Sequence, residues 1–115
     1  MKKDIKISGI VIEGDAYGRK IGFPTVNLQT DLKEFPPEGV YAGTAVLENI
    51  EYKAGIVIGP KEKDKHKIEA HLLEYTGDAY GKIVELTLHK FLREFKKFNT
   101  EEELIIQIKK DLEQI

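Results

Sequence analysis

The chain has 115 residues, 41% of them hydrophobic, and its 18 basic and 20 acidic side chains nearly balance. This length accommodates one domain, residues 1–115, and the balanced charge gives no field that would attract nucleic acid or a membrane surface. The absence of cysteine excludes disulfides, thiolate zinc sites and cysteine nucleophiles, and without a membrane span or signal-peptide core we expect a cytoplasmic protein.

Six stretches have the alternating or β-branched character of short strands, and turn residues separate them. In chain order they are residues 5–12, 23–28, 40–47, 51–58, 67–75 and 82–90. Glu48 and Asn49 are predicted to form a hairpin turn. Residues 29–38 and the charged residues 59–66 are predicted to be solvated loops.

After the last strand the hydrophobic period becomes helical. The stripe consists of Leu104, Ile105, Ile108, Leu112 and Ile115. Thr100 followed by Glu103 matches a capping box, which predicts where the helix begins. Six short strands and then one amphipathic helix predict a small closed β-barrel with the helix packed against it.

A glycine-rich stretch follows the first strand and continues into the second: Gly14-Asp15-Ala16-Tyr17-Gly18-Arg19-Lys20-Ile21-Gly22-Phe23-Pro24-Thr25-Val26-Asn27-Leu28. Glycine permits positive φ and close approach, so backbone N–H groups here could cradle phosphate. Pro24 favours an extended backbone, in which Thr25 and Asn27 project to the same side. Two neutral oxygen ligands beside Arg19 suit Mg²⁺ bridging nucleotide phosphates. A polar glycine hairpin fits the same residues, and no Walker motif is present.

The segment Gly18-Arg19-Lys20-Ile21-Gly22-Phe23-Pro24-Thr25-Val26-Asn27 resembles the Gly-Arg-x-Leu-Gly-Phe-Pro-Thr-Ala-Asn signature of riboflavin kinases. The resemblance covers nearly the whole chain. It implies a mostly β fold, a six-stranded Greek-key barrel with a C-terminal α-helix, which agrees with the hydrophobic pattern. It also implies that the ATP γ-phosphate passes to the ribityl 5′-hydroxyl of riboflavin, giving FMN and ADP, with Mg²⁺ as cofactor. We expect a monomer whose partners are these small molecules.

Glu69 is the candidate general base. Phosphoryl transfer to an alcohol needs an acceptor for the hydroxyl proton. Glu69 resembles the glutamate of the family's Glu-x-His strand, which serves as that base. His71 shares the same strand face and is either a rival base or a structural histidine. As metal ligands the two would form an incomplete site.

The stretch Phe91-Leu92-Arg93-Glu94-Phe95-Lys96-Lys97-Phe98 resembles the family's Leu-Arg-x-Glu-x-Lys-Phe segment, which closes over the flavin. This correspondence implies that Arg93 and Lys96 contact the flavin and that Phe91 lies near the nucleotide. Phe95 and Phe98 fit equally well as core anchors for the helix. The full set of residues expected at the nucleotide is Gly14, Arg19, Gly22, Thr25 and Phe91, with Thr25 and Asn27 as the Mg²⁺ ligands.

The resemblance breaks down after Ile58-Gly59. Riboflavin kinases usually have a Pro-Thr-containing loop there, whereas this chain continues Pro60-Lys61-Glu62-Lys63-Asp64-Lys65. We expect this charged segment to contribute little to flavin binding. It also leaves open a second hypothesis, a flavin- or nucleotide-binding barrel without turnover. A third, a nucleic-acid-binding barrel, is disfavoured by the balanced charge. Bacterial riboflavin kinases usually carry an adenylyltransferase domain, so the chain would be a stand-alone kinase or an excised domain.

Overall fold

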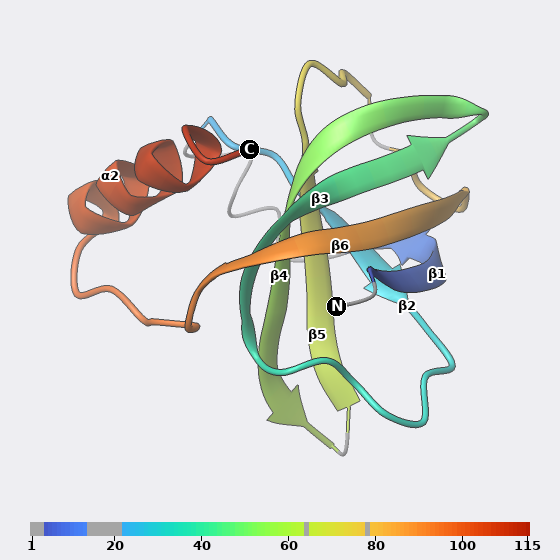
Figure 1. The fold of residues 1–115 in the computed structure, drawn as a ribbon, viewed down its shortest axis with the longest axis horizontal. Helices are drawn as coiled ribbons and strands as arrows, with labels where there is room; N and C mark the ends of the chain where they lie inside the picture. Colours follow the sequence, from blue (N-terminus) through green and yellow to red (C-terminus); the bar gives the residue numbers. More distant parts are fainter. Residues whose placement is uncertain (1–3, 14–21, 64, 78) are drawn as a thin grey trace.

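The structure is a computed structural model that describes residues 4–13, 22–63, 65–77 and 79–115. The elements in chain order are β1 Ile5–Ile12, β2 Val26–Gln29, β3 Gly39–Leu47, β4 Ile50–Glu62, β5 Lys65–Leu72, β6 Ile83–Arg93 and α2 Glu101–Leu112. The strands close into an antiparallel barrel in the order β1-β2-β5-β4-β3-β6, with α2 to one side (Figure 1). Because β3, β4 and β5 are sequential neighbours and β6 returns to pair with β3, the barrel is a Greek key. The predicted fold class is confirmed.

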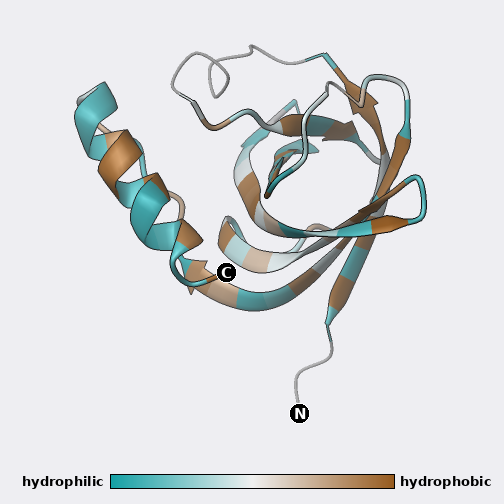
Figure 2. Ribbon diagram, turned by 90° about the horizontal axis from the view of Figure 1, so that it is seen from above, coloured by the Kyte–Doolittle hydropathy of each residue, from teal (hydrophilic) through white to brown (hydrophobic). Residues whose placement is uncertain are grey.

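The barrel interior is the hydrophobic core. Ile56 and Ile58 of β4 face Ile68 and Ala70 of β5, and all four side chains are at most 1% exposed. Residues between these positions point outward, so hydrophobic and hydrophilic residues alternate along the strands (Figure 2). At Gly43 the barrel closes tightly, because a Cβ atom there would collide with the carbonyl oxygen of Thr87 on β6. These inward side chains fix the register, and the register fixes which residues reach the outer surface.

Replacing Ile56 with alanine is expected to lower the free energy of unfolding by about 2–5 kcal/mol, since the closed barrel leaves a cavity that its walls only partly fill. Ile56 is 0% exposed, whereas Ile50 on the same strand is 55% exposed. The matched Ile50→Ala variant should therefore change stability by only about 0.5 kcal/mol. Urea unfolding followed by circular dichroism measures both. Equal losses would contradict the interior position of Ile56.

The sequence predicts the connection before β4 correctly but not the connection after it. Glu48 and Asn49 have φ angles of 52° and 66°, which is the primed turn of a two-residue hairpin, as predicted. The prediction of a solvated loop over residues 59–66 is wrong. β4 continues to Glu62 and β5 begins at Lys65, with Lys61 paired to His66 across the ribbon.

The charged composition of this ribbon explains the error. A two-stranded ribbon can expose both faces to water, so its side chains need not alternate between polar and apolar, and Lys61 and Lys65 are exposed. Pro60 lies in the register shift between Ile58 and Lys61, where the ladder does not require its missing N–H. His66 stabilises the same shift through Nδ1, which lies 2.7 Å from the carbonyl oxygen of Gly59.

Helix α2 begins where its capping residues predict. The Thr100 hydroxyl accepts a hydrogen bond from the backbone N–H of Glu103 at 3.1 Å, and three glutamates occupy the first turn, where the helix dipole favours negative charge. The helix stands beside the barrel (Figure 2). It is too short and too polar to cross a membrane, and so is any other helical segment of the described residues.

Candidate functional site

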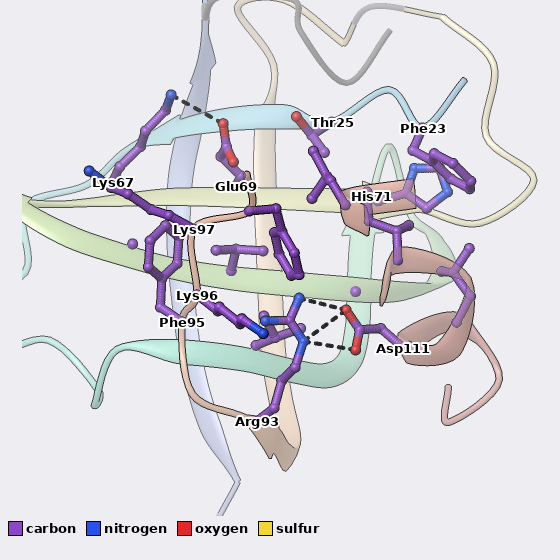
Figure 3. A pocket seen from close by; sticks show the side chains of 18 of the residues that line it. Phe23, Thr25, Lys67, Glu69, His71, Arg93, Phe95, Lys96, Lys97 and Asp111 are labelled. Carbon is purple, nitrogen blue, oxygen red and sulfur yellow. Dashed lines mark hydrogen bonds and ion pairs between the residues drawn. The ribbon is translucent and has the colours of Figure 1, made fainter. Parts of the chain in front are cut away.

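A cavity of about 600 Å³ lies between the outer face of the barrel and helix α2 (Figure 3). This volume is in the range of small-molecule sites. The barrel contributes one wall, and its polar groups include Thr25, Glu69 and His71. Residues 95–101 and the helix contribute the opposite wall. Its apolar members are Phe95, Phe98, Leu104, Ile108, Leu112 and Ile115.

Glu69 reaches this cavity because β5 alternates. Ile68 and Ala70 fill the barrel interior, so Glu69 and His71 project outward on the face that the sequence predicts. The Glu69 side chain is 25% exposed, and its Oε1 lies 3.2 Å from Nζ of Lys67. A positioned carboxylate at the edge of an apolar cavity is suited to accept a proton from a bound alcohol.

Asn27 lies directly opposite Glu69 in the β2–β5 pairing. It is 8% exposed, and its Oδ1 is a buried acceptor that has no hydrogen-bond partner among the described residues. Buried amide oxygens are almost always satisfied, so an unpaired one indicates a missing ligand, water or ion. Thr25 precedes the strand and lines the larger cavity, whereas Asn27 lines an adjacent cavity of about 250 Å³. Lys67 borders both cavities.

The chemistry of this pair fits a hard cation. Mg²⁺ takes neutral and anionic oxygen ligands and usually keeps several waters, so two protein oxygens and substrate phosphates can complete its shell. Among the described residues no group of three or more His, Asp or Glu side chains forms a metal site. Within the described part of the chain, Thr25 and Asn27 would be the protein ligands of a cation here, with substrate phosphates and water completing its shell.

His71 holds the segment that precedes β2. Its Nδ1 lies 2.6 Å from the carbonyl oxygen of Pro24, and its ring meets that of Phe23 edge to face with centroids 6.1 Å apart. A carbonyl oxygen only accepts, so Nδ1 donates and carries a proton. This geometry is that of a structural histidine, and it leaves Nε2 as the nitrogen that could accept a proton.

Arg93 and Lys96 both line the cavity and lie away from Glu69 in the close-up view (Figure 3). Arg93 is the last residue of β6, and its guanidinium forms an ion pair with Asp111 of α2 (Figure 3). Both cations also approach the ring of Phe98, with Arg93 Cζ at 5.7 Å and Lys96 Nζ at 5.5 Å from its centroid. The aromatic ring and the two cations form a platform beside the apolar wall.

Two other predicted nucleotide contacts, Gly22 and Phe91, do not line this cavity. Gly22 is exposed with φ of 91°, a conformation that favours glycine, and does not line the cavity. Phe91 is 44% exposed and packs edge-on against Tyr41, whose hydroxyl donates to the carbonyl oxygen of Pro37. Burial raises the pKa of Tyr41. Gly14 and Arg19 lie outside the described residues.

A family model for riboflavin kinases matches residues 1–115. The chain belongs to the riboflavin kinase family. It is 38% identical over 112 residues to the bifunctional riboflavin kinase/FMN adenylyltransferase of Bacillus subtilis, covering 91% of this chain and 35% of that protein. The chain thus spans about a third of the length of this curated relative.

Two solved structures share the barrel of the family. One is a macrolide-efflux protein from Streptococcus pneumoniae, with a TM-score of 0.88 and 29% identity over 96% of this chain and 38% of that chain. The other is the riboflavin kinase of Trypanosoma brucei, with a TM-score of 0.71 and 24% identity over 97% of this chain and 77% of that chain. At 24% identity, the comparison with the Trypanosoma brucei protein shows a shared fold only.

Two charged residues that line the large cavity, Lys67 and Asp111, are not among the residues predicted from the sequence. Lys67 was detectable, because strand alternation places it on the same face as Glu69. Asp111 was detectable as well, because it lies three residues after Ile108 and seven after Leu104, so helical spacing places its carboxylate on the apolar stripe. In the structure it is the buried residue of α2, only 9% exposed.

Proposed function

We propose that this chain is a riboflavin kinase, which transfers the γ-phosphate of ATP to the ribityl 5′-hydroxyl of riboflavin and releases FMN and ADP. The observation that carries the proposal is the shared cavity, in which Glu69 and Thr25 face an apolar and aromatic wall. Such a site can hold a planar ring on one side and a reacting hydroxyl on the other. Membership of the riboflavin kinase family supports this choice of substrate.

The flavin would occupy the side of the cavity formed by residues 95–101 and α2. Riboflavin is uncharged, so its affinity has to come mainly from burial and stacking of the ring. Phe95, Phe98, Leu104 and Ile108 supply apolar surface, and Lys96 supplies a hydrogen-bond donor. Gly59 and Pro60 also line the cavity, whereas the exposed Lys61 and Lys63 of the ribbon do not.

Thr25 and Asn27 would hold Mg²⁺ through the hydroxyl oxygen and the unpaired Oδ1. When bound, the ion neutralises the charge that develops on the transferring phosphate. The protein contributes rigid placement of the two oxygens. Asn27 is fixed in the β2–β5 ladder, and Thr25 follows a proline whose carbonyl is held by His71.

Glu69 would accept the proton of the ribityl hydroxyl as the oxygen attacks phosphorus. Its carboxylate lies on the strand opposite Asn27, so the base and the phosphate end of the nucleotide would meet at the β2–β5 pair. Lys67 holds Oε1 at 3.2 Å and restricts the rotamers of the carboxylate. A carboxylate held in one rotamer spends less time in orientations from which it cannot accept the proton.

The remaining assignments follow the family signature. Gly14, Arg19 and Gly22 would bind the phosphates, and Phe91 would lie near the nucleotide. We further propose a cytoplasmic monomer that acts on these small molecules and not on nucleic acid or membranes. No described feature favours the alternative of a barrel that binds flavin or nucleotide without turnover, because Thr25, Asn27 and Glu69 are all present.

Incubating the protein with riboflavin, ATP and Mg²⁺ should produce FMN and ADP in equal amounts, detected by chromatography with flavin fluorescence. Omission of Mg²⁺ and addition of a chelator should abolish the reaction. Binding of riboflavin without FMN formation would favour the non-catalytic barrel. Absence of both binding and turnover would reject the proposed substrate.

A further inference from the structure

Each nitrogen of the Arg93 guanidinium has a hydrogen-bond partner within the protein. Nε donates to both oxygens of Asp111, at 3.0 and 3.2 Å, and Nη2 donates to Oδ2 at 2.8 Å. Nη1 donates to the backbone carbonyl of Glu94 at 3.2 Å. The Asp111 carboxylate therefore occupies the Nε–Nη2 edge of the guanidinium, which is no longer available for a bidentate contact with a ligand.

Asp111 is equally committed to this arrangement. Its Oδ1 also accepts from the side-chain amide of Gln107, one turn earlier on α2, at 3.0 Å. The side chains of Arg93 and Asp111 are 22% and 12% exposed. An ion pair with this burial and this many hydrogen bonds restrains its elements strongly, because losing one partner leaves the other charge uncompensated.

The pair joins the two walls of the large cavity. Arg93 is fixed on the barrel side, since it pairs with the buried Val40 of β3. Asp111 lies near the end of α2, and residues 94–100 connect the two elements around the cavity. The last residue of the chain also lies close to the barrel. Cδ1 of Ile115 would be only 3.1 Å from a Cβ atom added to Gly55 of β4. The apolar side chains Leu104, Ile108 and Leu112 of the helix line the cavity.

We propose that Arg93 and Asp111 act together as a positioning pair, which sets the distance between α2 and the barrel and so the width of the flavin site. Arg93 then supports flavin binding through the helix rather than by touching the ring. This inference rests on the proposed function for its ligand. It differs from the role that the family correspondence implies for Arg93.

Riboflavin fluorescence titration in the absence of ATP separates the two roles. Arg93→Ala and Asp111→Ala should each weaken binding by about tenfold or more, and the double variant should be no worse than either, because both remove the same connection. A charge-exchanged variant, Arg93→Asp with Asp111→Arg, should recover part of the loss. Glu113→Gln, which removes a negative charge from the exposed end of the same helix, should bind like the parent.

A distance measurement tests the pair without any ligand. The chain contains no cysteine, so Glu51→Cys on the barrel and Ile106→Cys on the outer side of α2 accept spin labels at two defined, exposed positions. Double electron–electron resonance should give a narrow distance distribution in the parent and a broader or longer one with Asp111→Ala. Far-ultraviolet circular dichroism should confirm that the barrel and helix persist.

The possible results distinguish the two roles of Arg93 and test the proposed function separately. A loss of riboflavin affinity confined to Arg93→Ala would show that Arg93 contacts the flavin directly, and would overturn the proposal. An unchanged distance distribution in Asp111→Ala would overturn it as well. If the parent does not bind riboflavin, the proposed function fails, and the distance distributions still decide whether the pair positions the helix.

Discussion

Replacing Glu69 with glutamine is expected to lower the rate of FMN formation by about 10²–10⁴-fold, the usual contribution of general acid–base catalysis. Glutamine keeps the size of the side chain and can still accept a hydrogen bond, but it cannot take a proton. The backbone of β5 is held between β2 and β4, so the substitution leaves the strand in place. Riboflavin affinity should therefore change little. Single-turnover FMN formation and fluorescence titration measure the two effects separately.

The matched control for this variant is Glu85→Gln. Glu85 is an exposed carboxylate on the outer face of β6 and does not line the cavity, so its neutralisation should leave the rate unchanged. A second comparison uses His71→Asn, whose amide can still donate to the Pro24 carbonyl that Nδ1 contacts at 2.6 Å. If His71→Asn lowers the rate more than Glu69→Gln does, the base has been assigned to the wrong side chain.

The barrel could be predicted because its signals are local. Alternation in β1, β5 and β6 and the turn residues between strands are each legible over fewer than ten residues, and the change to helical period marks α2. The face of β5 that carries Glu69 and His71 follows from the same alternation. The predicted strand ends differ from the observed ones, because an end residue belongs to a strand only where a neighbouring strand pairs with it. For example, β2 begins at Val26 and not at Phe23.

The ribbon at residues 59–66 shows where local reasoning fails. Its charges suggest a loop, yet the ladder between Lys61 and His66 forms because the two strands already run side by side below it. Once Ile58 and Ile68 are paired in the core, extending the hairpin costs little additional loop entropy. The pairing of β4 with β5 in the barrel therefore determines the structure of this ribbon, and the composition of residues 59–66 does not predict it.

The geometry of the site depends on contacts that no sequence window contains. Arg93 and Asp111 are 18 residues apart, and their pairing depends on the path of residues 94–100 around the cavity. The unpaired Oδ1 of Asn27 is likewise a property of burial in the assembled barrel. The spacing of Thr25 and Asn27 and the resemblance to the riboflavin kinase signature both predict Asn27 as a Mg²⁺ ligand. That role stays a prediction, and the buried, unpaired Oδ1 supports it.

Replacing Thr25 with valine should impair turnover steeply, because valine keeps the shape of threonine but removes the hydroxyl oxygen proposed for Mg²⁺. Even groups outside a metal's first shell typically change affinity or activity by about 10–100-fold, so losing a direct ligand should cost at least that much. The loss should be largest at limiting Mg²⁺ and partly recovered at high Mg²⁺. Thr25 is half-buried and precedes β2, so the melting temperature without ligand should change little.

Thr25→Ser is the matched control, since it keeps the oxygen and removes only a methyl group. The rate of FMN formation is measured at increasing Mg²⁺ concentrations. Thr25→Ser should reach half of its maximal rate at about the same Mg²⁺ concentration as the parent, whereas Thr25→Val should need a much higher concentration. Asn27→Leu should shift the same curve, because it removes the second proposed ligand oxygen. Its effect on stability should be small or favourable, since an apolar side chain replaces a buried acceptor that lacks a partner among the described residues. A Thr25→Val variant with the parent's Mg²⁺ dependence would remove Thr25 from the metal site and leave Asn27 to bind the ion with the nucleotide phosphates and water.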